Sequence, residues 1–228
     1  MPDMVSARIA RWRQERAFKS LASSDHPLLY AYAAADWPDP ATPAREAPFL
    51  ALDFELDGLR KDAHLLQAGW VPFTGRGIAM AGAQSIDIRS YAQLDDEAVT
   101  IHGIGEQRAA QGEPVANVIT ALIEAMAGRV MVAHAAGIEK SSLQRMTQKL
   151  FGEPIPIRQV CTLSLERRIN PNCIGPEAYR LASCRKRYGL PEYQAHDALT
   201  DAIAAAELFQ AQLTRLSSAT TLGDLEHG

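Results

Sequence analysis

The stretch Phe49-Leu50-Ala51-Leu52-Asp53-Phe54-Glu55-Leu56 is apolar except for its two acids. A run of this kind predicts a buried β-strand. Because alternate side chains of a strand point to the same side, Asp53 and Glu55 would project together. Two carboxylates this close repel each other unless a positive charge lies between them, and a divalent cation accepts such oxygen ligands. The stretch therefore indicates metal-dependent chemistry. The alternative is a pair of surface acids or an acid paired with arginine, which the apolar flanks make costly.

The composition excludes several classes of protein. Of the 228 residues, 47% are apolar, as in an ordinary globular core. The net charge of −4 and the pI near 5.9 argue against a surface that coats nucleic acid, but not against an enzyme that grips a strand end locally. Three cysteines without Cys-x-x-Cys spacing predict reduced thiols in a cytoplasmic protein rather than disulfides or a zinc site. No run approaches the roughly 20 apolar residues of a membrane helix.

The first 47 residues form an expected N-terminal extension. Residues 1–35 resemble a helix, and three prolines within residues 36–43 predict an extended linker. The aromatic content of the extension favours packing over disorder, either on the main domain or on a second copy of the chain. We expect an extension at 1–47, a catalytic domain at 48–216 and a tail at 217–228.

The rest of the chain predicts an α/β fold. After the strand ending at Leu56, strands are expected first and strand–helix alternation later, which indicates a mixed sheet flanked by helices. The expected strands are 64–73, 77–88, 130–133 and a short one from Val160. The expected helices are 115–126, 139–150, one reaching Arg168, 179–188 and 197–216.

Two further motifs carry histidine and acid. His134 ends an apolar strand, and Glu139 begins the next helix. His196 and Asp201 open the final helix, with Asp197 as its expected N-cap. Loops at the carboxyl ends of strands host ligands in open sheets, so these residues are site candidates. Taken alone, Glu139 could be a helix N-terminal acid and His196 a surface histidine.

The ordered set Asp-x-Glu, His-x-x-x-x-acid and His-x-Ala-x-x-Asp resembles the DEDDh 3′-to-5′ exonucleases, which include the epsilon proofreading subunit of the bacterial replicative polymerase. Three further stretches agree with the family over about residues 48–215. These are Thr100–Ile104 with its His-Gly-Ile element, Val132–Ala136 beside the family's Ala-His-Asn-Ala, and Arg187–Pro191 followed by Ala195–Ala202.

The resemblance implies a ribonuclease-H-like fold and two-metal hydrolysis of phosphodiesters. By position, Asp53, Glu55, Glu139 and Asp201 would hold two Mg²⁺ or Mn²⁺ ions, and His196 would be the general base. Glu139 stands where the family has aspartate, and Leu56-Asp57 replaces a threonine pair, which puts contacts to the terminal nucleotide in doubt.

The implied substrate is the 3′ end of single-stranded nucleic acid, with DNA favoured and nucleoside 5′-monophosphates as products. RNA trimming of the oligoribonuclease or ribonuclease T type is an alternative. Candidate substrate contacts are Phe54, Leu56, His102 and His134, although Phe54 is favoured as core and His134 as structural. A basic cluster at Arg180, Arg185, Lys186 and Arg187 could meet phosphates or form a solvated helix face.

Two other classes remain open. A non-catalytic adaptor could keep the nuclease fold and bind a polymerase through the extension, although idle clustered acids would destabilise it. A phosphatase or nucleotidase could use Asp53 as nucleophile, which leaves His196 and Asp201 unexplained.

Overall fold

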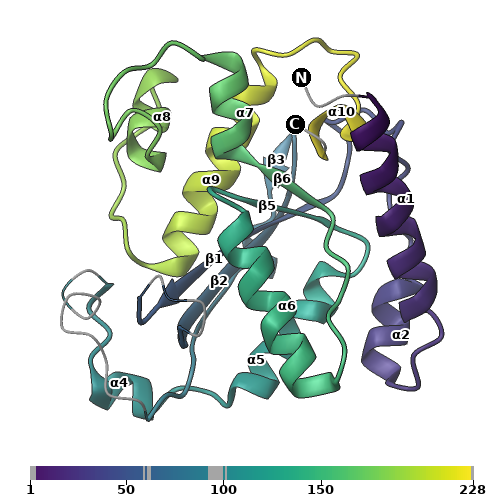
Figure 1. Ribbon diagram of the computed structural model, residues 1–228. Helices are drawn as coiled ribbons and strands as arrows, with labels where there is room; N and C mark the ends of the chain where they lie inside the picture. The colour runs from purple at the N-terminus through teal and green to yellow at the C-terminus, as the bar shows by residue number, and fades with distance from the viewer. Residues whose placement is uncertain (1–3, 59, 61–62, 92–99, 101, 227–228) are drawn as a thin grey trace.

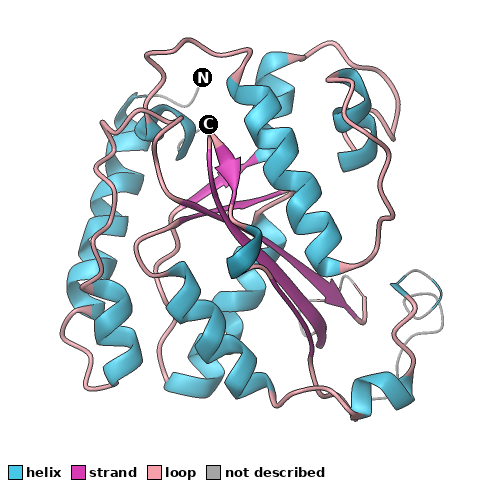
Figure 2. Cartoon of the chain, turned by 180° about the vertical axis from the view of Figure 1, so that it is seen from behind, coloured by secondary structure: helices cyan, strands magenta, loops and turns pink. Residues whose placement is uncertain are grey.

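The computed structural model describes residues 4–58, 60, 63–91, 100 and 102–226. At its centre lies a mixed β-sheet in the order β3-β2-β1-β5-β6, with β4 also paired to β2 (Figure 2). β1 runs antiparallel to β2 and parallel to β5, which is parallel to β6. The strands are β1 (Phe49–Leu56), β2 (Leu65–Thr74), β3 (Gly77–Ile78), β4 (Gln84–Asp87), β5 (Val130–Ala133) and β6 (Gln159–Cys161).

Helices cover both faces of this sheet (Figure 1). Leu50 and Leu52 of β1 belong to an apolar cluster with α5 (Val115–Met126) and α6 (Gly137–Phe151). Phe49 and Ala51 belong to a second cluster with α9 (Ala198–Leu213), α7 (Thr162–Ile169) and α10 (Leu222–Glu226). Alternate residues of β1 therefore enter opposite cores. The predicted mixed sheet flanked by helices is confirmed. Two short helices complete this part, α4 (Glu106–Ala110) and α8 (Leu181–Arg187).

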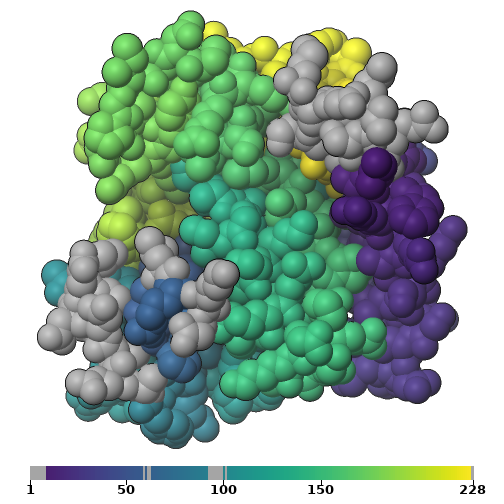
Figure 3. Space-filling view, viewed as in Figure 1, coloured from purple at the N-terminus to yellow at the C-terminus, as the bar shows by residue number. Residues whose placement is uncertain are grey.

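The N-terminal residues form two helices, α1 (Met4–Leu21) and α2 (Pro27–Ala33), rather than the single helix expected over 1–35. Pro27 lacks an N–H, so it suits the first turn of a new helix better than the interior of a long one. Leu21, Leu29 and Tyr32 are buried in the same apolar cluster as β1. The expectation of packing over disorder agrees with this burial. Figure 3 shows the N-terminal helices along one side of the molecule.

The proline-rich segment runs beside the C-terminal tail. The Ala44 amide donates to the Thr220 carbonyl at 3.0 Å, and the Leu222 amide donates to the Thr42 carbonyl at 2.9 Å. The tail contains α10, whose Leu222 and Leu225 are buried. Leu222 and Leu225 of the tail belong to the apolar cluster on the α9 face of the sheet, as does Ala44, which follows the proline-rich segment. The division at residues 47 and 216 stays a prediction.

The single strand expected over 77–88 is wrong. The segment forms β3, a short 3-10 helix η1 (Met80–Gly82) and β4, and both strands pair with β2. Pro72 explains the break, because its carbonyl accepts from the Ala79 amide at 2.9 Å but it has no N–H to donate at that edge. Other boundaries differ by a few residues: α8 begins at Leu181 rather than 179, and α9 ends at Leu213 rather than 216.

None of the helices in the described part of the chain is both long enough and apolar enough to span a membrane.

Candidate active site

Asp53 and Glu55 lie near the carboxyl end of β1. Asp53 pairs across the sheet with Gly69 of β2, and Glu55 pairs with Gln67. The two acids alternate with Phe54, which lies on the opposite face and is 5% exposed. Their carboxylates therefore share the face of the sheet covered by α9, as the alternation predicted.

The start of α9 is held directly over these strands. Asp197 is its N-cap, accepting from the Thr200 amide at 3.0 Å, which confirms the expected cap. The Ala198 amide donates to Gln67 Oε1 at 2.9 Å. A Cβ on Gly69 would lie 2.1 Å from the Ala198 carbonyl carbon, so only glycine allows this approach. The contact brings Asp201, one turn into α9, to the end of β1.

Three of the predicted acids meet in one cluster. Carboxylate oxygens of Asp53, Glu55 and Asp201 all lie within 4.8 Å of one another. Burial and neighbouring acids raise the pKa of Glu55 to about 7 and raise that of Asp53 well above its ordinary value. Hard divalent cations bind such oxygen sets, and their charge would offset the repulsion. The donor set therefore fits a divalent cation.

Glu139 lies in the first turn of α6 and is 3% exposed. Burial raises its pKa to about 8, and its charge contributes to the raised pKa of Asp53. Among the described residues, its buried Oε2 has no hydrogen-bond partner. Glu139 is not a member of the group of three carboxylates, but it is close enough for its charge to act on Asp53. A buried acid with a free oxygen, rather than an exposed helix-end acid, is the observed state.

His196 lies in the loop that enters α9. Its side chain is exposed, and its backbone adopts a left-handed φ of 70°. Its amide donates to Asp201 Oδ2 at 2.7 Å. This amide contact places His196 next to Asp201. The same loop brings Tyr193 to Asp201, a contact that no motif in the sequence signalled.

The other two candidate histidines, His134 and His102, have different surroundings. His134 uses both ring nitrogens, Nδ1 with Thr162 Oγ1 at 2.9 Å and Nε2 with the Tyr179 carbonyl at 2.8 Å. Burial lowers its pKa, so it is a neutral structural link between β5 and the loop before α8. His102 is 7% exposed, and its pKa is lowered by burial and by nearby His196. His102 therefore lies near the site. Ile101, next to it in the His-Gly-Ile element, falls outside the described residues.

The structure shows the surroundings of two groups of candidate substrate contacts. Phe54 belongs to the apolar core and has no surface to offer a nucleotide base, whereas Leu56 is partly exposed. In the basic cluster, Arg185 is 3% exposed and bonds within the protein, and Arg187 donates to Glu166 at 2.9 Å. Arg180 pairs with Glu177. Arg185 and Arg187 bind protein groups because α8 packs against α9 and lies beside Glu166 of α7. The Arg180 side chain is 72% exposed and Lys186 is also exposed, so this part of the cluster forms a solvated face.

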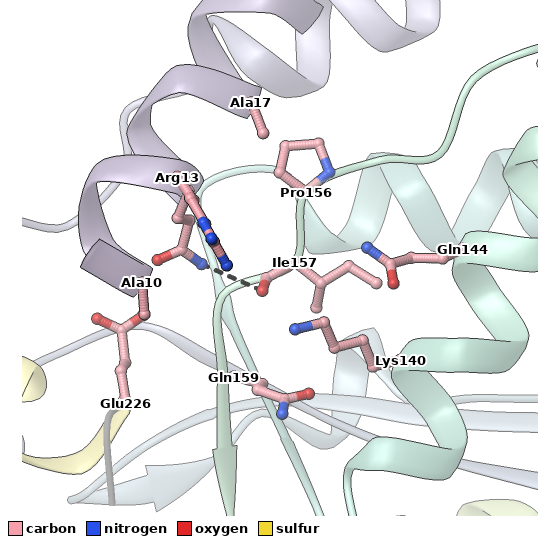
Figure 4. Close-up of a pocket in the computed structure, with 10 residues that line it drawn as sticks. Ala10, Arg13, Ala17, Lys140, Gln144, Pro156, Ile157, Gln159 and Glu226 are labelled. Atoms are coloured by element: carbon pink, nitrogen blue, oxygen red, sulfur yellow. Dashed lines mark hydrogen bonds between the residues drawn. The ribbon is translucent and has the colours of Figure 1, made fainter. Parts of the chain in front are cut away.

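A separate cavity of about 360 Å³ lies between α1 and α6 (Figure 4). Arg13, Gln14, Lys140 and Gln159 line it, together with Glu226. None of the five predicted catalytic residues contributes to its wall. The cavity is therefore distinct from the carboxylate cluster.

Comparison with known proteins agrees with this geometry. The exonuclease model of the RNase_T family matches residues 50–209. The chain belongs to the RNase_T exonuclease family. The resemblance to DEDDh exonucleases of the ribonuclease-H-like superfamily is thereby confirmed. A search of curated proteins found no match.

Solved structures of E. coli exonuclease I share the fold of this family member. One, in complex with a 5cy-dT13 oligonucleotide, superimposes with a TM-score of 0.65 at 17% identity over 77% of this chain and 42% of that one. The zinc-bound complex with single-stranded DNA has a TM-score of 0.65 at 19% identity over 75% and 41%. A complex with a dA16 oligonucleotide has a TM-score of 0.64 at 16% identity over 75% and 41%. The chain spans about two fifths of the length of exonuclease I.

Proposed function

We propose that this protein is a divalent-metal-dependent 3′-to-5′ exonuclease that removes nucleotides from the 3′ end of single-stranded nucleic acid, with DNA favoured. The observation that carries the proposal is the cluster of Asp53, Glu55 and Asp201, with carboxylate oxygens within 4.8 Å of one another in a family of exonucleases. The oligonucleotide complexes of structurally similar exonuclease I support the choice of DNA.

The chain's own groups suit the chemistry. Asp53, Glu55 and Asp201, with Glu139 beside them, would hold Mg²⁺ or Mn²⁺. The cations, when bound, would neutralise charge that develops on the phosphate and assist the leaving 3′ oxygen. His196 would accept the proton of the attacking water, because an imidazole exchanges protons near neutral pH. Hydrolysis would release a nucleoside 5′-monophosphate.

The test uses single-stranded DNA and RNA, each labelled at the 5′ end or the 3′ end, with Mn²⁺, Mg²⁺ or EDTA. A 5′-labelled strand should shorten stepwise and a 3′-labelled strand should release a labelled mononucleotide at once, only with metal. Asp201→Ala should lose at least about 10²-fold in rate. Asp25→Ala, at an exposed acid far from the cluster, is the control.

Three results would redirect the proposal. Preference for RNA would favour the trimming alternative. Cleavage that survives EDTA or Asp201→Ala would remove the carboxylates from the mechanism. Metal binding without cleavage of either polymer would favour a specialised substrate or the adaptor alternative.

A further inference from the structure

The loop between α8 and α9 supplies hydrogen bonds to both oxygens of Asp201. The Tyr193 hydroxyl donates to Oδ1 at 2.8 Å, and the His196 amide donates to Oδ2 at 2.7 Å. Each carboxylate oxygen has two acceptor positions, so both oxygens can still bind a cation. The two donors fix the plane of the Asp201 carboxylate and partly offset its negative charge beside Asp53 and Glu55.

Arg185 of α8 contacts this loop at two residues, Tyr193 and Pro191. Its guanidinium carbon lies 4.9 Å from the centroid of the Tyr193 ring, and Nη2 donates to the Pro191 carbonyl at 3.0 Å. On its other side, Nη1 donates to the Ala204 carbonyl at 2.9 Å and to Glu207 Oε2 at 2.7 Å. Arg185 is 3% exposed, so these contacts are made away from water and are strong. The loop is therefore tied to the helix that carries Asp201.

We propose that Tyr193 and Arg185 are positioning residues of the candidate metal site. Arg185 fixes the loop against α9, and the Tyr193 hydroxyl holds the Asp201 carboxylate in the orientation that a divalent cation requires. This inference rests on the proposed function for the identity of the ligand. Hydrogen-bond partners of metal ligands commonly change metal affinity or activity by about 10- to 100-fold.

Tyr188 provides a natural comparison within the same loop. Its hydroxyl donates to Glu166 Oε2 at 2.9 Å, so it also bonds a carboxylate. Glu166 is fully buried and receives further donors from Gln212 and Arg187. It is not in the cluster of three acids. Both tyrosine hydroxyls thus donate to a carboxylate, but only the carboxylate bonded by Tyr193 belongs to the candidate metal site.

The test compares Tyr193→Phe with Tyr188→Phe in the full chain, both of which keep the ring. Mn²⁺ binding is measured by electron paramagnetic resonance and calorimetry without nucleic acid. Tyr193→Phe should bind Mn²⁺ about 10- to 100-fold more weakly. Tyr188→Phe should bind Mn²⁺ like the unmodified protein, whatever it does to stability. In the cleavage assay, excess Mn²⁺ should restore part of the rate of Tyr193→Phe.

A second pair tests the role of Arg185. Arg185→Lys loses the planar group that stacks on Tyr193 and should weaken Mn²⁺ binding. Glu207→Gln keeps an oxygen that can accept from Arg185 Nη1, and the Ala204 carbonyl still accepts from the same group. The Glu207 side chain is also 38% exposed, so this variant should bind Mn²⁺ like the unmodified protein. Unchanged Mn²⁺ affinity in Tyr193→Phe would overturn the inference, even if the protein is an active nuclease. A different outcome would overturn only the proposed function. In that case the unmodified protein binds Mn²⁺, Tyr193→Phe binds it more weakly, and neither cleaves any nucleic acid.

Discussion

At the residue scale, two residues other than glycine adopt left-handed backbone conformations, Ala135 and His196, within the described chain. Such conformations cost an L-residue about 1–2 kcal/mol, except that asparagine and aspartate tolerate them better. Both residues stand at the site: Ala135 precedes the helix that carries Glu139, and His196 precedes α9. The strained backbone therefore lies in the turns that position the candidate acids Glu139 and Asp201.

We expect His196→Asn to reduce the cleavage rate by about 10²–10⁴-fold, because it removes the proposed general base. Asparagine tolerates the left-handed backbone, so the amide that bonds Asp201 should stay in place. The protein should unfold at the same denaturant concentration as before. His26→Ala, at an exposed histidine far from the site, should cleave normally. An active His196→Asn would assign the base to another group.

Ala135→Gly should raise the free energy of unfolding by about 0.5–1 kcal/mol, because glycine adopts the φ of 67° without a steric penalty. The same change in Ala116, exposed within α5, should lower it by about 1 kcal/mol. Urea unfolding of the two variants measures both changes in the free energy of unfolding, which should have opposite signs. A loss of stability in both would mean that Ala135 is not strained.

At the scale of the elements, the contact between β2 and α9 assembles the site. Gly69 lies opposite Asp53 in the sheet and beneath the first turn of α9. Gln67 bonds the first amide of the same helix. The distance between strand and helix, more than any single acid, sets how close Asp201 comes to Glu55.

Gly69→Ala should therefore weaken both stability and metal binding. Its Cβ would lie 2.1 Å from backbone atoms of Ala198 and Leu199, so α9 must move. Overpacking of this kind costs about 1–3 kcal/mol, and the shift should lower Mn²⁺ affinity. Gly77→Ala, where a Cβ meets no atom within 4 Å, is the control. Normal Mn²⁺ binding by Gly69→Ala would show that the helix is not positioned by this contact.

The elements also show the limits of periodicity. The strand at 49–56 and the helices at 115–126 and 197–216 were predicted to within a few residues, because each has a long, regular apolar pattern. The prediction of a single strand over 77–88 was wrong, because the pairing of this segment depends on Pro72 of the neighbouring strand. The short helix α10 lay in the expected tail, where burial against α9 rather than local pattern stabilises it.

At the scale of the whole molecule, the acidic cluster should make stability depend on pH and metal. The pKa of Glu55 is raised to about 7 and that of Glu139 to about 8, whereas an unfolded glutamate titrates near 4.5. Between these values the folded state holds more protons than the unfolded state. The free energy of unfolding of the metal-free protein should therefore fall as the pH rises from about 4.5 to about 8.

Urea unfolding in EDTA at several pH values measures this slope. Added Mn²⁺ should stabilise the protein most at the upper end of the range, because the ionised carboxylates bind it. In the metal-free protein, Glu139→Gln should make the free energy of unfolding depend less steeply on pH. A metal-free protein whose stability rises across this range would contradict the raised pKa values.

The sequence by itself determined the family, the mixed sheet and the identity of the acids. Strand alternation and the order of the motifs can both be read along the chain, so Asp53, Glu55, Asp201 and His196 could be selected together as a set. Only the tertiary structure decided which groups surround them. It turned Arg185 inward and brought Tyr193 to Asp201. Those contacts join residues of different elements, and they depend on packing distances that no local pattern encodes.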